Sequence, residues 1–138
     1  MSLSADDKLA IAELLARSAY AFDEQDLEML EACFTPDAVF SILIKGGDMI
    51  GPFEGREAVM KLYSDAMGAQ TDVRRHVASN IFFKSETGDP QVISNLTLFA
   101  TENATTTLLS VGVYQDTVRR TDDGWRVLKR HLDLDSPY

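Results

Sequence analysis

The sequence of 138 residues has little that would tie it to a membrane, a nucleic acid or an oxidising compartment. Its one cysteine excludes an internal disulfide. It has 13 basic against 22 acidic side chains, and the net charge of −9 repels phosphate backbones. No apolar run approaches the ~20 residues that cross a bilayer, and the first residues lack the basic and apolar stretches of a signal peptide. We therefore expect a cytoplasmic protein that binds neither nucleic acid nor a membrane.

Sequence motifs for cofactors and metals are also missing. There is no glycine-rich phosphate loop, no nucleophile elbow, and no cluster with the ligand spacing of a zinc or non-haem iron site. The lone Cys33 has no histidine near it in sequence, so we expect a small core residue and not a nucleophile. The sequence predicts no cofactor and no metal, and it favours proton transfer by side chains alone.

The length and composition fit one folded domain over residues 1–138. Hydrophobic residues make up 45% of the chain and charged residues 25%, the usual globular balance. A chain of this size buries roughly 68–70% of the surface that its unfolded form exposes, which is enough for a core and an internal cavity.

The first half of the chain reads as mostly helical. Ser4 is a suitable N-cap for a helix that ends near Phe22, and its apolar stripe contains one polar residue, Ser18. Tyr20 falls on the opposite side of that helix. Further helices are expected over residues 27–34 and from Gly55 to about residue 67, separated by strands over residues 38–44 and 49–53.

The second half reads as four strands, over residues 73–84, 91–101, 105–119 and 125–134. The short separators between them predict antiparallel neighbours that form a meander. The whole pattern predicts an α+β domain with helices on one face of a curved sheet.

The residues that could carry chemistry are few. His76 lies inside a strand, where alternation places it on one face with Ala78, Asn80 and Phe82, a suitable wall for a mostly apolar pocket. Asp23 lies at the end of the first helix, and a carboxylate that holds one imidazole nitrogen makes the other a better base near neutral pH. The alternative is that His76 is a hydrogen-bonded strand residue and Asp23 a solvated helix end. Spacing does not decide whether the two meet.

Other polar residues stand at positions where a core is usually apolar. We take these as candidate substrate-binding residues, with a packing role as the alternative: Ser18, Tyr63, Asn80, Asn95 and Tyr114. Arg130 and His131 are adjacent in one strand and point to opposite faces, so only one of them faces a pocket.

The order of elements and several short motifs resemble the SnoaL-like polyketide cyclase group of the nuclear transport factor 2-like superfamily, which includes scytalone dehydratase. The motifs that carry the resemblance are Asp23-x-x-Asp26, Phe34-Thr35-Pro36-Asp37-Ala38, Gly55-Arg56-Glu57-Ala58, His76-x-x-x-Asn80, Gly112-x-Tyr114-x-Asp116 and Gly124-Trp125-Arg126. The resemblance implies a cone-shaped, cystatin-like fold, with three N-terminal helices packed on a strongly curved, mostly antiparallel sheet that encloses a pocket.

In the dehydratase-like members, the resemblance implies a tyrosine and an aspartate near the end of the first helix and a strand histidine, all facing the cone. Asp23 and His76 match the aspartate and the histidine. The position of the tyrosine is occupied by Ser18 in this sequence.

Together these features predict a cofactor-independent lyase or isomerase that acts on an apolar aromatic or polycyclic small molecule. His76 would be the acid or base and Asp23 its orienting partner, and dehydration, double-bond migration and retro-aldol cleavage stay open. The alternative is a non-catalytic ligand-binding module, or the small subunit of a ring-hydroxylating dioxygenase.

We also expect a homodimer or higher homo-oligomer. Helices cover one face of the sheet, and apolar side chains of the strands leave the other face to be covered by a second copy. The side chains expected on that exposed face are Val77, Ile81, Phe83, Leu96 and Leu98.

Overall fold

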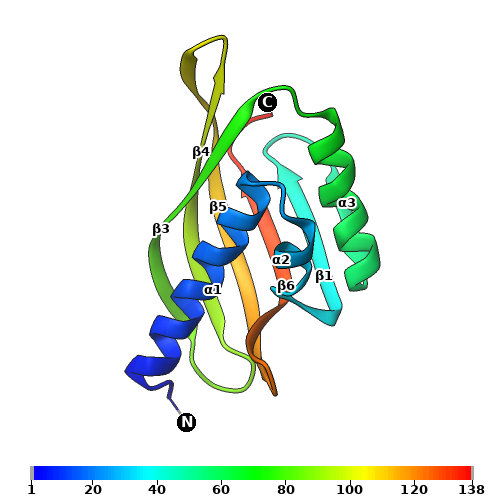
Figure 1. Cartoon of the computed structure of the whole chain (residues 1–138). Coiled ribbons are helices and arrows are strands. Elements are labelled where there is room, and N and C mark those ends of the chain that lie inside the picture. Colours follow the sequence, from blue (N-terminus) through cyan, green and yellow to red (C-terminus); the bar gives the residue numbers. More distant parts are fainter. Residues whose placement is uncertain (1, 138) are drawn as a thin grey trace.

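The computed structural model describes residues 2–137 and has the α+β architecture that the sequence predicts (Figure 1). The helices are α1 (Ala5–Asp23), α2 (Leu27–Glu31) and α3 (Arg56–Ala69). The strands are β1 (Phe34–Ile44), β2 (Met49–Glu54), β3 (Val73–Ser85), β4 (Gln91–Glu102), β5 (Thr105–Thr121) and β6 (Gly124–Leu134). Only α1 and α2 precede the strands, because α3 follows the β1–β2 hairpin; the expectation of three N-terminal helices is therefore corrected.

The six strands form one sheet in the order β2-β1-β6-β5-β4-β3. The chain from β3 to β6 is an antiparallel meander, as the short separators predict. Among residues 2–137, the single parallel pairing joins β1 to β6, which lie about 90 residues apart in the chain, and it sets the first hairpin beside the end of the meander. The sheet does not close on itself, because β2 and β3 are its two edges.

Helix α1 begins at a capping box, in which Ser4 Oγ accepts from the backbone N–H of Asp7 and the Asp7 carboxylate accepts from that of Ser4. The buried stripe of α1 contains Ile11, Leu15 and Ser18, as the helical spacing predicts. Tyr20 is 58% exposed on the opposite side. Helix α2 is shorter than predicted, since Phe34 already belongs to β1.

The helices lie on one face of the sheet, with α1 packed chiefly on β3 and α3 on β1 (Figure 1). The core fills the space between these helices and the inner face of the sheet. Its fully buried side chains include Ile11, Leu30, Phe34, Val59, Val92, Val118 and Val127. Cys33 is also buried there, and burial raises the pKa of its thiol, as expected for a packing residue.

The alternation of β3 changes at a β-bulge between Ser79 and Phe82, where Asn80 has a φ of 54°. Before the bulge, His76 and Ala78 face the helices; after it, Ile81 and Phe83 do so and pack against the core. Leu96 and Leu98 are also buried. The prediction that five apolar side chains lie on the exposed face of the sheet is therefore wrong for Ile81, Phe83, Leu96 and Leu98. It is right only for Val77, which is 43% exposed.

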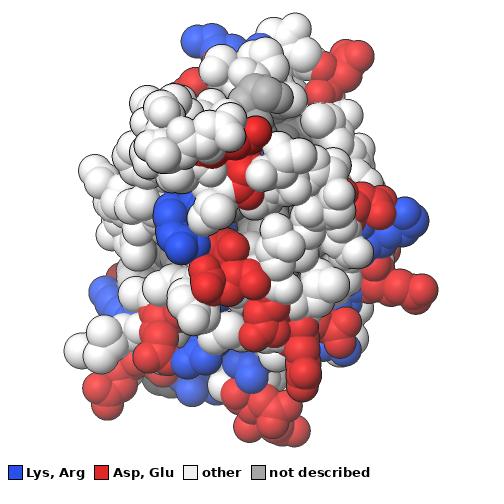
Figure 2. Space-filling model, turned by 45° about the horizontal axis from the view of Figure 1, so that its top comes forward, with Lys and Arg blue, Asp and Glu red and all other residues white. Residues whose placement is uncertain are grey.

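Charged side chains of both signs are interspersed on the face in Figure 2, with acidic ones in excess. No helix within residues 2–137 is long and apolar enough to cross a membrane.

Candidate functional site

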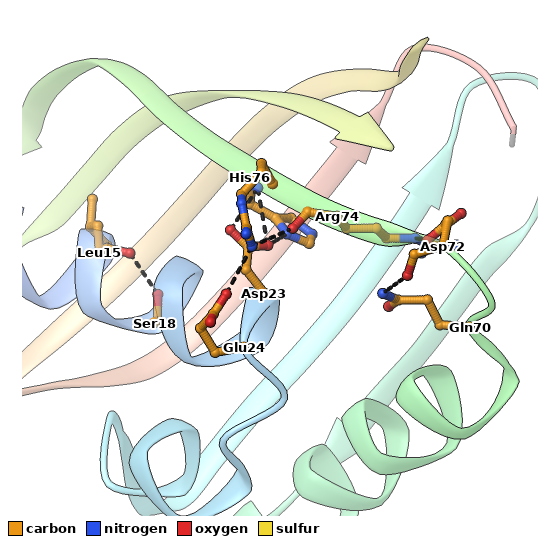
Figure 3. Close-up of polar contacts among 9 residues, drawn as sticks. Leu15, Ser18, Asp23, Glu24, Gln70, Asp72, Arg74 and His76 are labelled. Atoms are coloured by element: carbon orange, nitrogen blue, oxygen red, sulfur yellow. Dashed lines mark hydrogen bonds and ion pairs between the residues drawn. The ribbon is translucent and has the colours of Figure 1, made fainter. Parts of the chain in front are cut away.

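Asp23 and His76 are held together by three contacts between the last residue of α1 and the edge strand β3 (Figure 3). His76 Nδ1 lies 2.5 Å from Asp23 Oδ1, and the His76 backbone N–H donates to both carboxylate oxygens, at 3.1 and 3.0 Å. A carboxylate accepts only, so the proton between them lies on Nδ1 and the lone pair of a neutral ring lies on Nε2.

Both side chains are nearly buried, with 6% of the His76 side chain and 7% of that of Asp23 exposed. The ring of Phe22 stacks on the imidazole, with the ring centres 4.5 Å apart and the planes 25° apart. The same phenyl ring packs edge-to-face with Tyr63, with the ring centres 4.8 Å apart and the planes 84° apart. Phe22 thus fixes the plane of the imidazole and contacts both the imidazole and the phenol ring.

A second polar group lies deeper, between the end of α1 and the sheet. Arg130 on β6 donates to both oxygens of Asp116 on β5, from Nε at 2.8 Å and from Nη2 at 3.4 Å. Its Nη2 also donates to Ser18 Oγ at 3.2 Å, and its Nη1 donates to the Tyr63 hydroxyl at 3.4 Å. The guanidinium carbon lies 4.7 Å from the centre of the Tyr114 ring. Five residues from four elements thus form one buried network.

Burial decides the electrostatics of this network. Burial raises the pKa of Asp116 and the adjacent Arg130 opposes that rise, so the carboxylate depends on the arginine to stay charged. Burial acts to lower the pKa of Arg130, yet the charge of Asp116 outweighs it and the guanidinium stays protonated. Burial also raises the pKa of Tyr63, which remains a phenol that can donate a hydrogen bond.

Three hollows meet at His76. An apolar cavity of about 90 Å³ lies between the end of α1, α3 and the sheet, and its lining includes Phe22, Leu62, Tyr63, His76 and Tyr114. A cavity of about 10 Å³ lies beside the arginine network. An open groove of about 350 Å³ runs between α1 and β3 and reaches both Asp23 and His76. His76 therefore borders all three hollows, although its side chain is nearly buried.

The structure brings most of the predicted site residues together, but not the two asparagines. Ser18, Tyr63 and Tyr114 are buried and belong to the arginine network near His76. Asn80 and Asn95 are exposed on strands β3 and β4. The bulge turns Asn80 outward, and Asn95 alternates with the buried Ser94 and Leu96, so the prediction that either asparagine lines the pocket is corrected.

Of the adjacent residues Arg130 and His131, Arg130 faces the interior, with 5% of its surface exposed. Asp116 and Ser94 are functional candidates that the sequence reasoning did not select for the site. Asp116 alternates with Tyr114 along β5, and Ser94 lies directly opposite Tyr114 on β4. An acid among inward-facing positions of a central strand is the signal that could have found Asp116.

His131 belongs to a separate chain of hydrogen bonds on the outer face of the sheet. Its Nδ1 lies 2.7 Å from Ser41 Oγ, and its Nε2 lies 2.9 Å from Asp133 Oδ1. The second carboxylate oxygen of Asp133 accepts a hydrogen bond from the side-chain amide of Gln115. Both ring nitrogens are thus engaged. Within residues 2–137, no three carboxylate, histidine or cysteine side chains gather as a metal site.

The fold and this arrangement can be compared with known proteins. The model of the SnoaL-like domain matches residues 4–131, nearly the whole chain. The chain belongs to the SnoaL-like domain family. One relative is the uncharacterised protein Rv2910c of Mycobacterium tuberculosis, which is 30% identical to this SnoaL-like chain over 128 residues. The match covers 90% of this chain and 82% of that protein.

Solved structures place this SnoaL-like chain in the cystatin-like fold of nuclear transport factor 2-like proteins. One such protein from Novosphingobium aromaticivorans has a TM-score of 0.77 at 24% identity, over 94% of this chain and 82% of that one. A protein of the same organism, assigned as the beta subunit of an aromatic-ring-hydroxylating dioxygenase, has a TM-score of 0.80 at 18% identity, over 94% and 89%. At such identities the likeness concerns the fold alone.

Proposed function

We propose that this SnoaL-like protein is a cofactor-independent lyase or isomerase that moves protons on an apolar aromatic or polycyclic small molecule through His76 and Asp23. The observation that carries the proposal is the 2.5 Å contact between Asp23 Oδ1 and His76 Nδ1, because it leaves Nε2 as a base. Within residues 2–137, Nε2 has no hydrogen-bond partner, and the imidazole borders an apolar cavity.

The reaction begins when Nε2 takes a proton from a carbon next to a carbonyl group. The resulting imidazolium is stabilised by the Asp23 carboxylate, and the negative charge moves to the carbonyl oxygen of the substrate. The Tyr63 hydroxyl accepts from Arg130, so its own hydrogen can be donated to that oxygen. The imidazolium then returns its proton to a leaving hydroxyl, or to another carbon when a double bond migrates.

The size of the apolar cavity limits how the substrate enters. Its volume of about 90 Å³ is below the ~300–1,000 Å³ typical of ligand pockets. Binding of an aromatic or polycyclic compound therefore requires movement of lining side chains, and Leu62, a half-buried side chain on α3, is one candidate to move. Tyr114 packs against Arg130, also lines this cavity and is proposed to line the bound substrate.

A test uses 4-hydroxy-4-phenylbutan-2-one, since one compound reports three reactions. Dehydration gives an unsaturated ketone, retro-aldol cleavage gives benzaldehyde and acetone, and proton abstraction alone exchanges the carbon-bound hydrogens for deuterium. We expect the wild-type protein to catalyse the exchange and His76→Gln to lose ~10²–10⁴-fold in rate. An unchanged rate in a folded His76→Gln protein contradicts the proposal.

The alternative is a non-catalytic ligand-binding module or a dioxygenase small subunit, favoured by the similarity to a protein assigned as such a subunit. Under this alternative, Asp23 serves to bind the backbone of β3 through the His76 N–H. His76→Gln keeps that backbone contact, so under this alternative it would leave ligand binding unchanged. A larger partner that copurifies from the native source would favour the subunit.

A further inference from the structure

The small cavity beside His76 has the size and the polarity of a site for one water molecule. Its volume is about 10 Å³, near the minimum of ~10–15 Å³ that a water requires. Polar groups from five elements form part of its wall: Ser18, His76, Ser94, Asp116 and Arg130. A buried water usually makes about three hydrogen bonds, and this wall offers that many partners.

Ser94 supplies the most specific signal. It lies on β4, is 1% exposed, and its Oγ has no hydrogen-bond partner within the described part of the chain. A buried hydroxyl without a partner costs ~1–3 kcal/mol, so such groups are generally satisfied by water or by a ligand. Because Ser94 borders this cavity, we expect the missing hydrogen-bond partner of its Oγ to lie in the cavity.

Arg130, which also borders this cavity, has a donor left over. A guanidinium carries five N–H groups, and Arg130 uses four of them on Asp116, Ser18 and Tyr63. Among residues 2–137, one Nη1 hydrogen has no acceptor. Ser18 donates to Leu15 O at 2.8 Å and accepts from Arg130, which leaves it one lone pair. The wall therefore contains both donors and acceptors for a water.

We propose that this cavity binds the water molecule that leaves or attacks the substrate, which makes the reaction a reversible dehydration. The inference rests on the proposed function and selects one of its reactions. His76 contributes to the walls of both the 10 Å³ cavity and the apolar cavity, as do Phe22 and Tyr114. His76 thus borders both the water site and the space for the substrate.

The step balances without an added reagent. Nε2 of His76 takes a proton from the carbon next to the carbonyl group, and the electron pair forms the double bond as the C–O bond of the β-hydroxyl breaks. The imidazolium gives that proton to the leaving hydroxide, and the product is one water held by Ser94 and Arg130. In reverse, Nε2 takes a proton from this water as its oxygen attacks the double bond. A carbonyl fragment from retro-aldol cleavage is too large for the cavity.

The test combines crystallography with isotope labelling. A high-resolution crystal structure of the wild-type protein should show a water peak ~2.7–3.2 Å from Ser94 Oγ. The variants are Ser94→Ala, which removes the hydroxyl, and Ser94→Val, which also fills the cavity. Ser110→Ala is the matched control, because Ser110 Oγ is likewise buried without a partner but does not border this cavity.

With 4-hydroxy-4-phenylbutan-2-one in ¹⁸O-water, we expect the wild-type protein to form the unsaturated ketone and to place ¹⁸O in the β-hydroxyl group. Ser94→Ala should lose about fivefold to tenfold in that rate, Ser94→Val about 100-fold, and Ser110→Ala should keep it. Deuterium exchange at the carbon next to the carbonyl should persist in Ser94→Val and disappear in His76→Gln.

Failure of the two proposals gives different results. A cavity without a water peak, or dehydration by Ser94→Val at the wild-type rate, overturns the water site while deuterium exchange still supports the acid–base function. If His76→Gln retains both deuterium exchange and dehydration at the wild-type rate, the proposed function is overturned. A wild-type protein that binds the water but acts on no β-hydroxy ketone overturns the assignment of that water to the reaction.

Discussion

The carboxylate of Asp23 binds two groups of His76, the ring Nδ1 and the backbone N–H, from a position 53 residues earlier in the chain. The double contact fixes the backbone of β3 and the rotation of the imidazole at once. Because both side chains are nearly buried, water competes little for the carboxylate.

The first prediction concerns the tautomer of His76. Neutral His76 should carry its proton on Nδ1, since Asp23 accepts there, and Asp23→Asn should weaken that preference because an amide can also donate. Long-range ¹H–¹⁵N correlation spectra report the tautomer of each ring. The second histidine, His131, is the internal control, and Asp23→Asn should leave its signals in place. A wild-type His76 protonated on Nε2 would contradict the prediction.

The second prediction concerns the buried ion pair of Arg130 and Asp116. Arg130→Met should lower the free energy of unfolding by about 3–5 kcal/mol, because it leaves the Asp116 carboxylate buried without a counter-charge. The double variant Arg130→Met, Asp116→Leu should recover much of the loss. Urea unfolding measures both.

The matched control for that experiment is Arg119→Met, in the more exposed pair with Asp89. A surface pair contributes roughly 0–1 kcal/mol, so the change should be small. Equal losses in the single and double variants at Arg130 would show that the charge of Asp116 is not the cause.

The third prediction concerns acid stability. A hydrogen bond from Arg120 lowers the pKa of Asp7 from 3.8 to about 2, so folding favours its ionised form. The stabilisation is present above pH 3.8 and is lost as the pH falls through about 2. Asp7→Asn should therefore lower Tm at pH 6 and have little effect below pH 2.

Asp6→Asn is the control, since it removes the same charge one residue earlier. Added salt should shrink the effect of Asp7→Asn at pH 6, because the pair with Arg120 is at the surface. A difference in Tm that stays constant from pH 6 to pH 2 would assign the effect to the helix cap instead.

The fourth prediction concerns self-association, which we propose occurs through the outer face of the sheet. Exposed apolar side chains there are Val77, Phe82, Phe99 and Leu108, between 37% and 59% exposed. We expect a homodimer that Phe82→Ser with Phe99→Ser dissociates, whereas Leu9→Ser on α1 leaves it intact. Light scattering after size exclusion measures the mass, and a wild-type monomer at micromolar concentration would contradict the proposal.

Local patterns predict much of this fold. The Ser4 cap, the stripe of α1 and the four strands of the meander follow from helical spacing, alternation and short turns. The bulge at Asn80 escapes such reasoning, because one residue in a left-handed conformation reverses the alternation of every position after it. That reversal explains both the outward Asn80 and the inward Ile81.

The site divides in the same way. The sequence alone determines that His76 and Asp23 lie on a strand and at a helix end, that Tyr63 is available for packing, and that no side chains have the spacing of a metal site. Only the tertiary structure decides that Asp23 reaches His76, that Arg130 and not His131 faces inward, and that Asp116 is its partner. These contacts join residues 14 to 112 positions apart, and their geometry depends on how the strands align and how α1 lies on them. Periodicity within one element carries no information about either.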